Sequence, residues 1–113
     1  MSNFEWTTLL GSNEPEEGHA LTIGADGSIY IAGHTWGDLD RQTNNGGYGD
    51  AFLTKFNPNG TKEWTRLLGT SDSDRGRALT TGSDGSIYIA GYTEGDLDGQ
   101  TSNGGYDDAF LTK

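Results

Sequence analysis

A repeat with a period of 58 residues constrains this chain more than any other feature. Residues 6–55 align with residues 64–113 without a gap, and 35 of the 50 aligned positions are identical. The best-matched stretch runs from Gly24 to Gly33 and returns from Gly82 to Gly91. A fixed period of this length is typical of proteins that stack copies of one structural unit. We therefore expect two similar units, not one ordinary globular core.

Composition limits the classes of function. Hydrophobic residues make up 31% of the chain and the formal net charge is −10, a combination that also occurs in disordered chains. The apolar residues are strongly patterned, which favours a folded chain over disorder. Seventeen acidic side chains against seven basic ones argue against binding to nucleic acid or to an anionic membrane. Cysteine is absent, which excludes disulfides and thiolate metal sites.

The pattern of apolar residues predicts an all-β chain. We expect short strands at residues 4–10, 19–23, 28–34, 50–56, 61–68, 77–81, 86–92 and 108–113. Asp26-Gly27 and Asn57-Pro58-Asn59-Gly60 are strong turn signals between such strands. No segment shows the spacing of an amphipathic helix over three turns. Four short antiparallel strands per unit describe a β-propeller blade, and a parallel β-solenoid is the rival fold.

The order of these segments resembles a known family. The stretch Asp108–Lys113, the turn and strand from Asn57 to Trp64, and Gly85–Gly91 together look like the bacterial SBBP β-propeller repeat. That family is a distant relative of the WD-repeat propellers, whose Trp-Asp dipeptide is absent here. The resemblance implies four-stranded blades around a central channel. It also suggests a secreted or cell-surface parent protein.

By that resemblance the chain, residues 1–113, begins and ends inside a blade. Residues 18–69 hold one complete blade, residues 76–113 hold three strands of a second, and residues 4–10 are an outermost strand without a blade. We expect residues 4–10 of one chain to lie beside residues 108–113 of the next, because an unpaired strand edge needs a partner. Three chains would close into six blades and four chains into eight. We favour the homotetramer, because a smaller ring crowds the innermost strands.

The acidic loops are candidate calcium sites. Asp38 and Asp40 alternate in the first copy, as Asp96 and Asp98 do in the second. Calcium prefers several oxygen ligands, which such loops supply. The spacing does not satisfy the EF-hand pattern, and loop aspartates commonly hydrogen-bond their own backbone instead. No other cofactor is expected.

Three aromatic residues in polar loops are candidates for a face that binds a glycan or a peptide: Trp36, Tyr48 and Tyr106. Trp36 is not repeated, since Glu94 stands at its position in the second copy, and incidental exposure is the alternative. His19 and His34 have no cysteine or histidine at the usual ligand spacing. We therefore expect no zinc there and interpret both as solvated or loop-packed imidazoles.

The differences between the two copies are not spread evenly. The 15 mismatches fall mainly in residues 12–17 against 70–75, and at positions 34, 36, 41, 44 and 49. In a propeller, the loops that contain most of these mismatches emerge on the same face. A binding surface would produce this pattern, and so would the ordinary tolerance of loops to change.

The sequence predicts a non-catalytic propeller scaffold that assembles with itself by strand exchange. No Gly-x-Ser-x-Gly elbow is present, and nothing pairs a nucleophile with a base, so no enzyme is expected. The alternative is a calcium- or glycan-binding adhesion module. No secretory signal and no apolar run of about 20 residues occurs. With the boundaries inside blades, these features are typical of a fragment or an engineered repeat protein.

Overall fold

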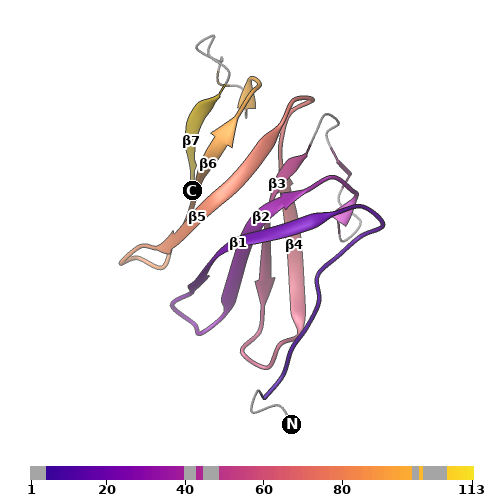
Figure 1. The fold of residues 1–113 in the computed structure, drawn as a ribbon. Helices are drawn as coiled ribbons and strands as arrows, with labels where there is room; N and C mark the ends of the chain where they lie inside the picture. Colours follow the sequence, from indigo (N-terminus) through magenta and orange to yellow (C-terminus); the bar gives the residue numbers. More distant parts are fainter. Residues whose placement is uncertain (1–4, 40–42, 45–48, 98–99, 101–106) are drawn as a thin grey trace.

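Two antiparallel β-sheets make up the computed structural model, which describes residues 5–39, 43–44, 49–97, 100 and 107–113. Figure 1 shows the four-stranded first sheet and the three-stranded second sheet side by side. The first has the order β1 (Glu16–Ile23), β2 (Ile29–Thr35), β3 (Asp50–Phe56) and β4 (Lys62–Leu68). The second has the order β5 (Asp74–Thr81), β6 (Ile87–Thr93) and β7 (Asp108–Thr112). The described residues contain no α-helix, so the all-β prediction is confirmed for them.

Glycine-containing turns connect the strands where the sequence predicts them. Between β1 and β2, Gly27 has a φ of 85° and the amide of Ser28 donates to Oδ1 of Asp26 at 2.9 Å. Between β3 and β4, Gly60 has a φ of 91° and its amide donates to the carbonyl of Asn57 at 2.9 Å. A positive φ is a conformation that residues with a Cβ rarely adopt. These turns set the registers of both hairpins.

The first strand of each sheet is longer than predicted. The expected strands at 19–23 and 77–81 begin at Glu16 and Asp74 instead. In each copy a β-bulge separates the added residues from the predicted part, since the register shifts between Gly18 and Ala20 in β1 and between their counterparts in β5. Backbone pairing continues past the bulge, but the residues there lack the apolar alternation from which a strand is predicted. The prediction was therefore wrong at these ends.

The two sheets meet along β5. This strand contacts β1, β2 and β3 of the first sheet. The hydroxyls of Thr22 and Thr81 lie 3.0 Å apart, and the Thr81 hydroxyl donates to the carbonyl of Ile23 at 2.8 Å. Ala32 and Phe52 are among the most buried residues of the first sheet. Apolar side chains of two packed sheets thus form the core, with β1 and β5 as neighbours.

The segment before β1 is not a strand in the single chain. Residues 5–10 of the expected strand 4–10 have no strand partner, and residue 4 lies outside the described part. The ring of Trp6 lies against Gly60, so this segment passes along the β4 side of the first sheet (Figure 1). Within the described residues, no helix is long and apolar enough to cross a bilayer.

Candidate functional site

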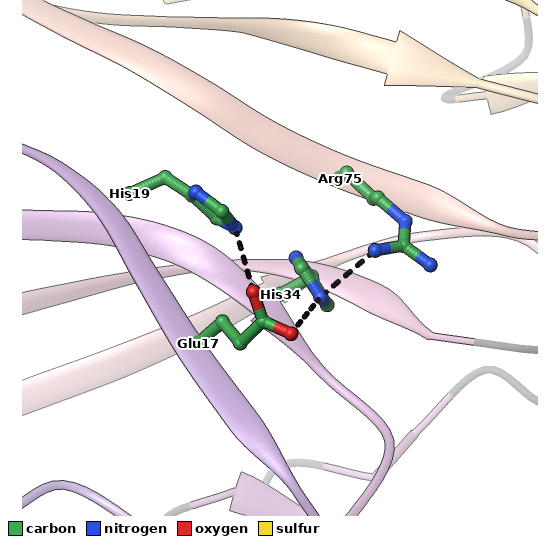
Figure 2. Close-up of polar contacts among 4 residues, drawn as sticks. All are labelled: Glu17, His19, His34 and Arg75. Atoms are coloured by element: carbon green, nitrogen blue, oxygen red, sulfur yellow. Dashed lines mark hydrogen bonds and ion pairs between the residues drawn. The ribbon is translucent and has the colours of Figure 1, made fainter.

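Three side chains with metal-ligating atoms converge where β1 and β2 pair. Figure 2 shows Glu17 and His19 from β1 beside His34 from β2. The Glu17 carboxylate lies 3.3 Å from Nε2 of His19 and 3.7 Å from Nε2 of His34. One ligand atom from each of the three residues lies within 4.8 Å of the others. We call Glu17, His19 and His34 the His–Glu cluster.

The β-bulge brings the cluster together. Glu17 pairs directly with His34 across the hairpin. His19 is the extra residue of the bulge, because Gly18 and Ala20 on either side of it pair with consecutive residues of β2. Bulges commonly re-aim a side chain. Here the imidazole of His19 stacks on that of His34, with ring centroids 5.1 Å apart. Two histidines separated by 15 positions in the sequence are therefore in contact.

His34 is a fully buried histidine. Trp36 meets its ring edge-on at a centroid distance of 4.8 Å. Arg75 of β5 reaches it from the second sheet, with Nη1 at 3.0 Å from Nε2 of His34, and its guanidinium lies 5.2 Å from the centre of the Trp36 ring. The interpretation of His34 as a solvated or loop-packed imidazole is therefore wrong, because β2 carries it into the contact between the two sheets.

The contact with Arg75 defines the protonation of His34. A guanidinium can only donate hydrogen bonds, so Nε2 of His34 accepts and the proton lies on Nδ1. The pKa of His34 is lowered to about 4, mainly by burial and also by the positive charge of Arg75, while the carboxylate of Glu17 opposes the shift. The ring is thus neutral near pH 7. Its buried Nδ1 has no hydrogen-bond partner among the described residues.

The cluster is where the two copies differ most in chemistry. Glu17, His19, His34 and Trp36 correspond to Arg75, Arg77, Tyr92 and Glu94 in the second copy. Two of these counterparts, Arg77 and Tyr92, contact each other through a guanidinium 5.8 Å from the ring centre. The second copy therefore has the same backbone with no histidine at all. Because these differences gather in one place, general loop tolerance does not explain them well.

Other differences between the copies preserve their contacts. In the second copy Thr70 donates its amide to the Asp74 carboxylate at 2.7 Å, and the hydroxyl of Thr93 also donates to that carboxylate. The first copy builds the same arrangement with Ser12, Glu16 and Thr35 at the equivalent positions. Burial raises the pKa of Asp74, and the hydrogen bonds oppose the shift. These substitutions maintain a structural contact and do not indicate a ligand.

Comparison with known proteins agrees with the repeat architecture. Residues 63–98 match the family model of the SBBP β-propeller repeat. Residues 63–98 carry the SBBP β-propeller repeat. The segment that matches contains β4, β5 and β6, and the 58-residue offset carries most of the same pattern back to the first copy.

The chain also has a curated relative. Regulatory protein FlaEY of Caulobacter vibrioides is 31% identical over 113 aligned residues. The alignment covers 91% of this chain and 12% of that protein. The chain thus spans about an eighth of the length of the relative that it matches.

The structure places only some of the predicted site residues of the SBBP repeats. The Oδ1 atom of Asp38 accepts a hydrogen bond from the amide of Asn44, six residues later in the chain, at 2.8 Å. Asp96, its counterpart, is exposed. Four residues of the calcium and ligand-face hypotheses lie outside the described residues: Asp40, Tyr48, Asp98 and Tyr106. Those hypotheses stay predictions.

Trp36 is half-buried and belongs to the surroundings of the His–Glu cluster. Besides its contacts with His34 and Arg75, its amide donates to the carbonyl of Pro15 at 3.1 Å. It lines a surface hollow together with Glu14, Pro15 and Glu17. Contacts within the chain therefore already cover part of Trp36, the side chain that was expected to face a ligand.

The pKa of His34 predicts a pH dependence of stability. In the unfolded chain His34 takes up a proton at its usual pKa of 6.5, but in the folded chain only at about 4. The free energy of unfolding should therefore fall as the pH drops from about 6.5 to about 4, by up to about 3 kcal/mol. The charged and titratable groups that face the ring are Glu17 and His19 from β1, and Arg75 and Arg77 from β5.

Denaturant unfolding with a chelator present at several pH values measures this effect. The matched control is His34→Tyr, because tyrosine already occupies this position in the second copy. The variant should lose the part of the pH dependence that His34 contributes. An equal slope in both proteins across this range would contradict the assignment.

Proposed function

We propose that the chain is a non-catalytic propeller scaffold that assembles with copies of itself into a closed ring. One observation carries this proposal. The six residues Asp-Ala-Phe-Leu-Thr-Lys occur twice. In β3 they are covered, with Ala51 at 0% and Phe52 at 2% exposure, whereas in β7 Ala109 is exposed and Leu111 is 74% exposed. The same sequence is thus more buried in β3, which pairs with β4 and contacts β5, than in β7, which has no outer strand among the described residues.

The N-terminal segment has the sequence of the missing strand. Trp6-Thr7 and Leu9-Leu10 repeat as Trp64-Thr65 and Leu67-Leu68 of β4. In the single chain Leu9 is 93% exposed and Trp6 is 43% exposed. An exposed apolar segment and an exposed strand edge of matching sequence can each cover the other.

The first sheet supplies the expected register. There Phe52 pairs with Leu67 and Thr54 with Thr65. Applying the 58-residue offset pairs Phe110 with Leu9 and Thr112 with Thr7 of the neighbouring chain. The hydroxyls of Thr54 and Thr65 lie 2.8 Å apart and are buried, so the threonine pair between chains would have the same hydrogen bond.

The ring would contain two kinds of contact between blades. Inside a chain, Thr22 of β1 meets Thr81 of β5 through their hydroxyls. Between chains, the equivalent positions are Thr80 of one chain and Ile23 of the next. Isoleucine has no hydroxyl, so that bond cannot form. Near the cluster, Tyr92 would face Glu17 of the next chain, where a phenol can donate to a carboxylate. The contact between chains is thus less polar along the inner strands.

The mass of the assembly in solution tests this proposal. Light scattering coupled to size exclusion should give a mass of four chains of 12.1 kDa each, with three chains as the alternative ring. A stable monomer would contradict ring closure. Titration with calcium and a glycan array complete the experiment, since a ligand bound with micromolar affinity would favour the adhesion module over a pure scaffold.

A further inference from the structure

We propose that Glu17, His19 and His34 form a binding site for a divalent transition-metal ion of the Zn²⁺ class. The site lies on β1 and β2 and is separate from the acidic loops. Two imidazole nitrogens and one carboxylate are a donor set that suits zinc, nickel or copper, whereas calcium and magnesium prefer oxygen atoms alone.

The geometry is close to that of a preformed site. Tetrahedral zinc with ligand bonds of about 2.0–2.2 Å places its ligand atoms a little over 3 Å apart. The Glu17 carboxylate already lies 3.3 Å from Nε2 of His19 and 3.7 Å from Nε2 of His34. Small rotations of Glu17 and His19, both exposed in the single chain, would complete the set around the fixed ring of His34.

The burial of His34 bears on the site as well. This side chain is 1% exposed, yet its Nδ1 has no hydrogen-bond partner among the described residues. Burying a polar atom without a partner is costly, and such atoms in a folded protein call for an explanation. A metal at Nε2 would leave the proton on Nδ1, so the support for the site is that burial fixes the ring with Nε2 3.7 Å from the Glu17 carboxylate. The second copy, which has Tyr92 here, does not bury an imidazole.

Arg75 occupies the position that the ion would take beside His34. Its Nη1 lies 3.0 Å from Nε2 of His34. Arg75 is partly exposed and also packs on Trp36, so its side chain can keep that packing while it releases the imidazole. It therefore opposes the metal in two ways, by its positive charge and by its hydrogen bond. Removing it should strengthen binding.

Isothermal titration of the chelator-treated, tag-free protein with Zn²⁺ tests the site. We expect one ion per chain, and a visible absorption band when Co²⁺ replaces Zn²⁺. Each of Glu17→Gln, His19→Arg and His34→Tyr should weaken binding by at least ~100-fold, since even outer contacts of a metal site contribute 10–100-fold. Arg75→Met, which keeps the apolar stem, should strengthen binding by at least ~10-fold.

The variants are chosen so that misfolding does not imitate the result. Glu17 is exposed and glutamine has the same shape, while arginine and tyrosine already stand at the other two positions in the second copy. Far-UV circular dichroism and the mass of the assembly should match those of the parent chain. Three results would each overturn the proposal. The parent chain does not bind Zn²⁺, the three variants bind Zn²⁺ as tightly as the parent chain, or the parent chain binds Ca²⁺ as tightly as Zn²⁺.

Discussion

A chain that starts at residue 11 will not form the closed ring. Its mass in light scattering should fall from that of the full assembly to that of single chains or of open, concentration-dependent associations. The reason is that β7 would keep an unpaired edge with Leu111 74% exposed, and no segment would remain to cover it. A strand edge of this kind also promotes irregular association, so lower solubility is expected.

A shorter deletion is the matched control. Removing residues 1–3 alone leaves Trp6 and Leu9 in place and should leave the assembly mass unchanged. If the chain that starts at residue 11 assembles like the full chain, the N-terminal segment is not the exchanged strand.

Replacing Gly33 by alanine will strongly destabilise the first sheet. A Cβ at this position would lie 1.8 Å from the carbonyl oxygen of Glu17, which no real contact allows, so β1 and β2 would have to separate. Because both atoms are close to the backbone, side-chain rotation cannot relieve the overlap. We expect the free energy of unfolding to fall by about 3 kcal/mol or more. Denaturant unfolding measures the change.

The paired glycine supplies the control for this substitution. A Cβ on Gly18 would meet its nearest atom, Cγ2 of Ile31, at an ordinary 3.5 Å. Gly18→Ala should therefore change stability by less than about 1 kcal/mol. Similar losses in both variants would show that the close approach at Gly33 is not what the hairpin requires. Gly91, with a Cβ 1.9 Å from the carbonyl oxygen of Arg75, should behave like Gly33.

The repeat and its turns could be predicted from the sequence because they depend on local signals. The glycines at positions 27 and 60 have the positive φ values that their turns require. The starts of β1 and β5 could not be predicted in this way. Pairing of Gly18 with Gly33 depends on close approach of two backbones, and glycine carries no apolar pattern to indicate it.

The candidate site escaped prediction for a related reason. Metal sites are usually recognised by short spacings between ligands, but His19 and His34 meet through strand pairing and a bulge. A signal was nevertheless present. Positions 17 and 19, and likewise positions 34 and 36, are two residues apart at the ends of two predicted strands, and all four change chemical type between the copies. Comparing the chemical types of the residues that differ, and not only their number, would have grouped these four positions as one site.

Strand exchange between chains is the central claim, and a designed cross-link tests it most directly. The chain has no cysteine, so Thr7→Cys with Thr112→Cys introduces a single pair at the expected contact between chains. The positive control is Thr54→Cys with Thr65→Cys, whose hydroxyls lie 2.8 Å apart within one chain. Disulfides require such short separations between paired strands.

After mild oxidation at low protein concentration, both double variants should lose their free thiols. On a denaturing gel without reductant, the control should run as a single chain. The Thr7→Cys, Thr112→Cys protein should run as covalently linked chains that extend up to the number in the ring, four by our proposal. A protein that keeps its thiols, or that stays a single chain under conditions that oxidise the control, would contradict strand exchange.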